Sequence, residues 1–98
     1  MSEFDCQIGI LYVSIHITNA TSLKDRRIVL NSIKEKIRAK FNVSVADVGG
    51  QDKWQTATLA FCAVSNDGRF LENVLQEVLK LLDSFHRIEV CKHETEFL

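Results

Sequence analysis

Proline is absent from this sequence of 98 residues, and cysteine, glycine and aromatic residues are all scarce. Without proline, no cis-prolyl turn can shape the chain. The three cysteines, Cys6, Cys62 and Cys91, are odd in number and far apart, which argues against a disulfide framework and against paired thiolate ligands for a metal. We therefore expect a domain held together by its hydrophobic core in a reducing compartment, the cytoplasm.

Signals for export or for a membrane are also missing. The stretch 1–17 contains an apolar run, but it has no basic leader, and it alternates polar with apolar residues as a strand does. A membrane span would need a longer unbroken apolar run. We expect a single domain over 1–98 with no membrane association, and the net charge of -1 selects no class of partner.

Hydrophobic periodicity predicts four strands and two helices. Alternation predicts strands over 8–17, 43–48, 54–64 and 88–98, and a phase change in the last one indicates a bulge or a change of partner strand. Helical spacing predicts one helix over 23–40 and a second helix whose apolar positions run from Phe70 to Phe85. The apolar stripe expected on the first helix consists of Leu23, Leu30, Ile33, Ile37 and Phe41.

The order of these elements predicts the fold class. A β-α-β-β-α-β chain with right-handed crossovers forms an α+β, ferredoxin-like domain, in which two helices cover one face of a four-stranded sheet. Because the first and third strands are the most apolar, we expect them to form the central pair.

Basic residues are concentrated in the first helix. The segment 22–41 carries seven lysine or arginine residues against two acidic ones, a local charge of +5, so the rest of the chain carries -6. Such a surface is typical of phosphate recognition, and the candidate nucleic-acid contacts are Lys24, Arg27, Lys34 and Arg38. The alternative is that these long side chains only flank the apolar stripe and keep their charges in water.

Arg26 differs from the other basic residues because its helical angle points to the centre of the apolar stripe. A buried guanidinium needs a carboxylate partner. We therefore predict a structural ion pair between Arg26 and either Asp47 or Asp52.

The starts of the two helices form a second candidate site. If both helices follow strands that run parallel, their free N–H groups meet at one end of the sheet and can bind an anion such as phosphate. The residues would be Ser22, Lys24, Ser65 and Asn66. The alternative is that Ser22, and Asn66 or Asp67, cap their own helices.

The sheet face away from the helices is a third candidate. We expect Tyr12, Trp54, Thr56 and Thr58 to lie on it. Exposed aromatics on such a face can stack RNA bases, but the aromatic signature of RNA-recognition motifs is absent. An interface with a second copy of the chain explains Tyr12 and Trp54 better, because such amphipathic side chains favour interfaces.

Residues for catalysis or for a cofactor are not evident. No histidine is tied by sequence to a nucleophile and an orienting acid, and Cys91 with His93 falls far short of a four-ligand zinc site. We expect no enzyme, no cofactor and no metal.

Several short motifs are similar to those of the YlxP-like family of small bacterial proteins, and the resemblance covers residues 7–98. The motifs are SLKDRR over 22–27, FNVSVADVG over 41–49, QDKWQ over 51–55 and AVSND over 63–67. The resemblance implies a ferredoxin-like fold, a bacterial cytoplasmic location and genes placed among those for translation, with no established activity. Asp47 stands where glutamate is more usual in the family.

These observations lead to one main hypothesis and two alternatives. The main hypothesis is a non-enzymatic domain that binds RNA or the ribosome through the basic helix. The alternatives are a homodimeric structural domain joined through the open sheet face or through the hairpin of the second and third strands, with Trp54 as anchor, and a binder of phosphate or nucleotide at the helix starts.

Overall fold

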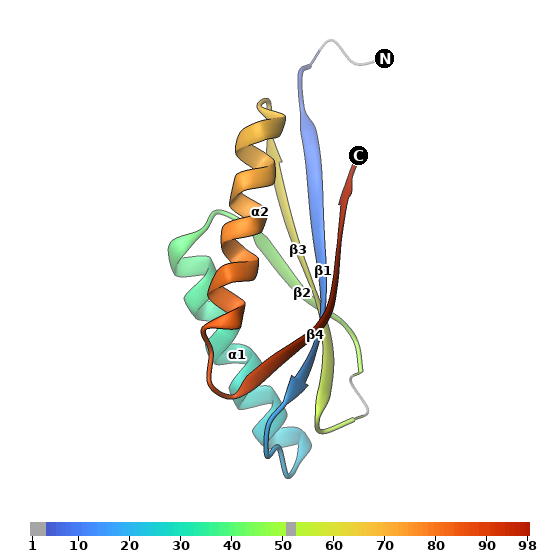
Figure 1. Ribbon diagram of the computed structural model, residues 1–98, viewed down its shortest axis with the longest axis vertical. Helices are drawn as coiled ribbons and strands as arrows, with labels where there is room; N and C mark the ends of the chain where they lie inside the picture. The colour runs from blue at the N-terminus through green and yellow to red at the C-terminus, as the bar shows by residue number, and fades with distance from the viewer. Residues whose placement is uncertain (1–3, 51–52) are drawn as a thin grey trace.

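The protein is an α+β domain with a ferredoxin-like arrangement, as the order of elements predicts (Figure 1). The structure, a computed structural model, describes residues 4–50 and 53–98. In chain order the elements are β1 (Gln7–Ile17), α1 (Leu23–Lys40), β2 (Ser44–Gly49), β3 (Thr56–Ser65), α2 (Gly68–Asp83) and β4 (Ile88–Phe97).

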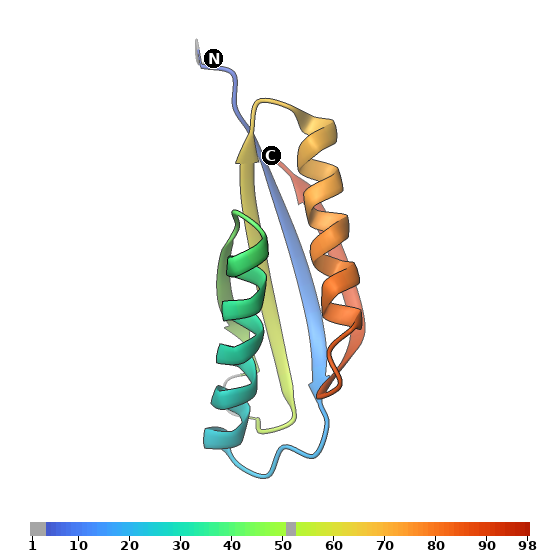
Figure 2. The ribbon, with the colours of Figure 1, turned by 90° about the vertical axis from the view of Figure 1, so that its left-hand side faces the viewer.

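The strands form one antiparallel sheet in the order β2-β3-β1-β4. The central position of β1 and β3 confirms the prediction from their apolar character. Both helices pack on the same face of this sheet, with α1 over the side of β2 and β3 and α2 over the side of β1 and β4 (Figure 2). The opposite face of the sheet carries no helix.

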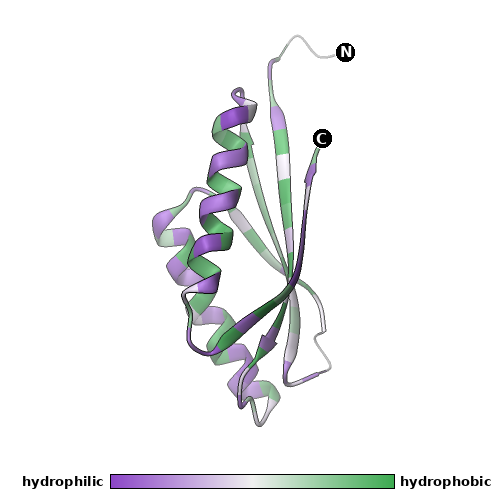
Figure 3. Cartoon of the chain, in the orientation of Figure 1, coloured by the Kyte–Doolittle hydropathy of each residue, from purple (hydrophilic) through white to green (hydrophobic). Residues whose placement is uncertain are grey.

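The core lies between the sheet and the two helices. Alternate residues of β1 from Leu11 to Ile17 point into it, and the fully buried Phe61 faces them from β3. Apolar residues line the sides of both helices that face the sheet (Figure 3). Leu30, Ile33 and Ile37 of α1 are buried as predicted. The two central strands are the easiest to predict from the sequence, because every residue that points from them into the core is apolar.

Two large apolar residues lie outside this core, contrary to the sequence prediction. Leu23 is 48% exposed and Phe70 is 58% exposed. Both belong to the first turn of their helices, where the chain has not yet reached the middle of the sheet. Val29 of α1, which the predicted stripe does not include, is buried.

The bulge predicted in the last strand is present. Ser14 pairs with Lys92 and Ile15 pairs with Val90, so Cys91 is the extra residue of β4. A bulge of this kind moves the following side chains to the other phase of the strand. This explains why Val90 and Phe97 do not follow one alternation in the sequence.

Gly9 permits a close approach between β1 and α2. A Cβ atom at Gly9 would lie 2.8 Å from Leu75 Cδ1 and 3.1 Å from Leu71 Cγ. Glycine therefore allows α2 to lie directly against the first half of β1. Gly50 has a different role. Its backbone φ angle of 75° is one that glycine adopts without strain.

Candidate nucleic-acid interface

The basic surface lies on α1, whose start is set by Ser22. The Ser22 Oγ accepts a hydrogen bond from the Asp25 backbone N–H at 3.0 Å, and Ser22 itself has an extended backbone. This is a helix N-cap, and it satisfies one of the free N–H groups of the first turn. The helix therefore begins at Leu23, and the angular positions of its basic side chains follow from there.

Arg38 shows on which side of α1 the predicted basic residues lie. Its Nη2 donates to the Val45 carbonyl oxygen of β2 at 3.3 Å, so its side chain lies toward the β2 edge of the sheet. Arg27 and Lys34 are separated from Arg38 by eleven and four residues, which places them on the same side of the helix. We call Arg27, Lys34 and Arg38 the basic flank; it extends along about 16 Å of helix.

Two carboxylates near the basic flank are engaged elsewhere. Asp25 pairs with Arg87 on the side of α1 that faces α2, at 3.0 Å. Asp47 pairs with the buried Arg26. Within residues 4–50 and 53–98, Lys24 and the three residues of the basic flank take part in no ion pair. No described carboxylate, including Glu35 of the same helix, lies within ion-pair distance of these four charges.

Arg26 is structural rather than part of this surface. Its Nη1 lies 2.9 Å from Asp47 Oδ2, and its Nη2 lies 3.3 Å from Oδ1, so the pairing is bidentate. Its Nε also donates to the Thr56 carbonyl oxygen at 3.0 Å. The side chains of Arg26 and Asp47 are only 7% and 16% exposed. The structure thus contains the predicted pair with Asp47; the alternative partner, Asp52, lies outside the described residues.

The shared anion site predicted at the helix starts is not formed. β1 and β3 are antiparallel, not parallel as that prediction required, and the end of β3 at Ser65 pairs with Gln7 at the start of β1. The start of α1, next to Ser22, therefore lies at the opposite end of the sheet from the start of α2, next to Ser65 and Asn66 (Figures 1 and 2). The prediction was wrong because adjacent central strands of this fold run in opposite directions.

The alternative, that the residues cap their own helices, is what the structure shows. Asp67 Oδ1 accepts hydrogen bonds from the backbone N–H groups of Arg69 and Phe70, at 3.0 and 3.2 Å. Ser65 Oγ accepts from the Asp67 N–H at 3.1 Å and supports the cap. Asp67 rather than Asn66 is the N-cap of α2.

The residues predicted on the open face belong to two strands and a loop. Tyr12 of β1, and Thr56 and Thr58 of β3, belong to the rows that alternate with the buried residues, so they lie on the face without helices. Trp54 is 52% exposed, but it lies in the loop before β3, which begins at Thr56 rather than at Trp54. The aromatic side chain is therefore held by a loop and not by strand pairing.

The described part of the chain contains neither a cluster of metal ligands nor a helix that could span a membrane. No group of three or more histidine, cysteine or acidic side chains there is arranged to hold a metal ion. Neither α1 nor α2 offers the apolar length that crossing a bilayer requires.

Sequence reasoning missed a groove between α1 and the segment that follows α2. It is formed by one side of α1 and by the segment 84–87 that connects α2 to β4. The available signal was Ile28, an apolar residue outside the predicted stripe that is 56% exposed in the structure. The groove itself could not be predicted, because its two walls come from parts of the chain that only the fold brings together.

Comparison with known proteins identifies relatives of the whole domain. Residues 8–95 match the model of a family described as "Protein of unknown function (DUF503)". The "Uncharacterized protein YlxP" of Bacillus subtilis (strain 168) is 40% identical over 90 residues, which cover 92% of this chain and 98% of that protein. These matches confirm the resemblance to the YlxP-like family that the sequence motifs indicate.

Among solved structures, the de novo designed protein Foldit4 is similar with a TM-score of 0.56 and 11% sequence identity, covering 94% of this chain and 96% of the designed one. At this identity the likeness shows the fold alone. SnoaB, a cofactor-independent oxygenase from Streptomyces nogalater, matches with a TM-score of 0.45 and 9% identity over 97% of this chain and 92% of its own. That similarity is too weak to bear on function.

Proposed function

The chain belongs to the DUF503 family of proteins of unknown function, and from this premise we propose that it is a non-enzymatic domain that binds structured RNA through α1. Lys24 and the basic flank contact phosphates in this proposal. The observation that carries it is the flank itself: three cations on one side of a helix, none of them in an ion pair with a carboxylate of the described residues.

The distribution of charge over the whole chain supports the same surface. The segment that contains α1 carries +5, while the total is only -1. On the far side of the sheet, β4 carries Glu89, Glu94 and Glu96 against Lys92. An approaching polyanion is therefore attracted to the α1 side and repelled from the β4 side, which orients the encounter.

The position of the basic flank beside an edge strand also suits a phosphate backbone. β2 pairs only with β3, so its other edge is free of protein strands. Arg38 bridges α1 to that edge through the Val45 carbonyl oxygen. A nucleic-acid strand that lies along α1 thus meets cations on a rigid helix, and sequence-independent phosphate contacts are the expected mode of binding.

The test is the salt dependence of binding to a fluorescently labelled RNA hairpin. In the variant Arg27→Gln, Lys34→Gln, Arg38→Gln, three phosphate contacts are lost. The slope of log affinity against log salt should then become shallower by about two to three. Neutral glutamine is chosen so that the effect measures lost attraction rather than added repulsion.

A control variant with the same change in net charge is available. Arg69→Gln, Lys80→Gln, Lys92→Gln removes three exposed cations that lie on α2 and β4. This control should bind the hairpin with the wild-type salt slope. Equal weakening in both triple variants, or wild-type binding that does not respond to salt, would contradict the proposal.

A second candidate function is a homodimeric assembly domain, and the composition of the open sheet face favours it. Ile10 and Tyr12 of β1 lie beside Cys62 and Ala60 of β3, so apolar or small side chains occupy the middle of a face that no helix covers. Two such faces packed together would remove this apolar surface from water. This candidate does not compete with RNA binding, because α1 lies on the opposite side of the sheet.

A further inference from the structure

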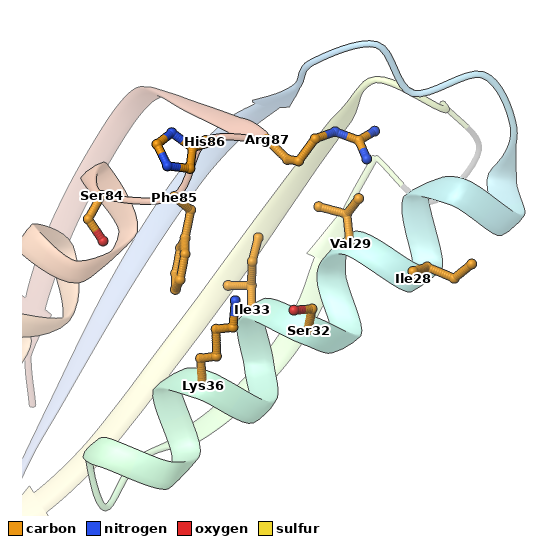
Figure 4. Close-up of a pocket in the computed structure, with 9 residues that line it drawn as sticks. All are labelled: Ile28, Val29, Ser32, Ile33, Lys36, Ser84, Phe85, His86 and Arg87. Carbon is orange, nitrogen blue, oxygen red and sulfur yellow. The ribbon is translucent and has the colours of Figure 1, made fainter.

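A groove of about 490 Å³ separates the middle of α1 from the segment that follows α2 (Figure 4). It is open to solvent along one side. Its volume falls within the range of about 300–1,000 Å³ that is typical of sites for small molecules. The residues that line it are Ile28, Val29, Ser32, Ile33, Lys36, Ser84, Phe85, His86 and Arg87.

The interior of the groove is apolar. The buried Val29 and Ile33 form the wall on the side of α1, and the half-buried Phe85 reaches toward them from the other side (Figure 4). Ile28 is 56% exposed beside them. An apolar body that covers these side chains would remove their exposed surface from water, which favours binding.

The rim of the groove carries positive charge and hydroxyl groups. No carboxylate is among the lining residues. Arg87 is already engaged, because its Nη2 bonds to Asp25 and its Nε donates to the Thr18 carbonyl oxygen. Lys36 has no carboxylate partner among the described residues, and its Nζ lies 5.4 Å from the centre of the Phe85 ring. The ring holds the ammonium group at the mouth of the groove.

From this geometry we propose that the groove binds a small amphipathic carboxylate. The carboxylate pairs with Lys36 Nζ and accepts from the Ser32 hydroxyl, which lies one helical turn earlier on the same side of α1. The apolar body of the ligand lies over Val29, Ile33 and Phe85. An uncharged molecule of the same shape gains the apolar contact but not the ion pair with Lys36. The site should therefore bind the carboxylate more tightly than its uncharged analogue.

This site is independent of the proposed RNA surface. The basic flank lies toward β2, as the Arg38 contact shows, whereas the groove lies on the side of α1 that faces α2. Lys24 and the flank contribute nothing to the lining. Binding of a carboxylate can therefore be tested and lost without any change in RNA binding.

The experiment compares decanoate with decanol, which share an apolar chain and differ in charge. Titration into the full-length protein is followed by isothermal calorimetry and by the NMR signals of the Ser32 and Phe85 amides. We expect saturable binding of decanoate, with shifts centred on those two residues, and binding of decanol weaker by about tenfold. Equal affinity for both compounds, or shifts spread over the sheet, would overturn the proposal.

Two variants and their controls separate the parts of the site. Lys36→Met keeps the length of the side chain and should weaken decanoate about tenfold while leaving decanol unchanged; Lys24→Met, on the same helix outside the groove, should change neither. Ser32→Trp fills the mouth of the groove and should abolish binding of both compounds, whereas Asn31→Trp should not. Unaltered decanoate affinity in Lys36→Met would overturn the proposal.

The same Ser32→Trp variant tests other occupants of the groove. If the wild type sediments as a dimer that Ser32→Trp converts to a monomer, a second copy of the chain occupies the groove and the proposal fails. If the oligomeric state is the same in both proteins while decanoate binding is lost, the groove is a ligand site as proposed.

Discussion

Arg26 of α1 and Asp47 of β2 form a bidentate ion pair beneath the start of the helix, with Nη1 and Oδ2 separated by 2.9 Å. The pair joins the first helix to an edge strand that is short and only half-buried. Arg26 also bonds to the carbonyl oxygen of Thr56, so one guanidinium holds α1, β2 and β3 together. The position of the basic flank relative to β2 depends on this connection.

Removing one partner of this pair should be costly. Asp47→Ala leaves the guanidinium of Arg26 buried without its carboxylate, and we expect a loss of about 3–5 kcal/mol in the free energy of unfolding, measured by urea denaturation. The double variant Arg26→Met, Asp47→Leu removes both charges and should recover most of that loss. Similar destabilisation in the single and double variants would show that the apolar pair cannot replace the ionic one.

Gly9 should tolerate no side chain without loss of stability. In Gly9→Ala the new Cβ would lie 2.8 Å from Leu75 Cδ1, so α2 or its leucines must shift, and we expect a loss of about 1–3 kcal/mol. Gly68→Ala is the matched control, because the three heavy atoms nearest to its Cβ all belong to the amide end of the exposed Gln7 side chain, which can move away. A lower melting temperature for Gly68→Ala than for Gly9→Ala would contradict this account.

The identity of the α2 cap can be tested by neighbouring substitutions. Asp67→Ala removes the acceptor of two backbone N–H groups and should cost about 1 kcal/mol of stability. Asn66→Ala should change stability by less than about half of that amount, since the Asn66 side chain makes no capping bond in α2. Chemical denaturation of both variants measures the difference in stability. A larger loss of stability in Asn66→Ala than in Asp67→Ala would contradict the assignment of Asp67 as the N-cap.

Self-association through the open sheet face and the loop before β3 that carries Trp54 predicts a concentration-dependent dimer. In sedimentation equilibrium we expect the wild type to dimerise, and both Tyr12→Glu and Trp54→Ala to shift the protein toward the monomer. Phe70→Ala removes an equally exposed aromatic ring from α2 and should have no effect. A wild-type protein that is monomeric at high concentration would exclude this interface.

The sequence alone was sufficient for the architecture. Alternation in Leu11, Val13, Ile15 and Ile17 and the helical spacing of Leu30, Ile33 and Ile37 identify which sides of these elements face the core, because burial imposes those periods directly. The pairing of Arg26 with Asp47 was also predictable. A charged residue at the centre of an apolar stripe requires a partner, and few acidic residues were within reach.

Tertiary structure decided what the surfaces can do. The antiparallel pairing of β1 with β3 sets Ser22 and Ser65 at opposite ends of the molecule, a result that the capping motifs themselves do not contain. The groove between Lys36 and Phe85 exists only because α1 and the end of α2 lie side by side. Local sequence patterns indicate which side of each segment is buried and which is exposed to solvent. A site depends instead on the directions of different segments and the distances between them, which arise from packing of the whole chain.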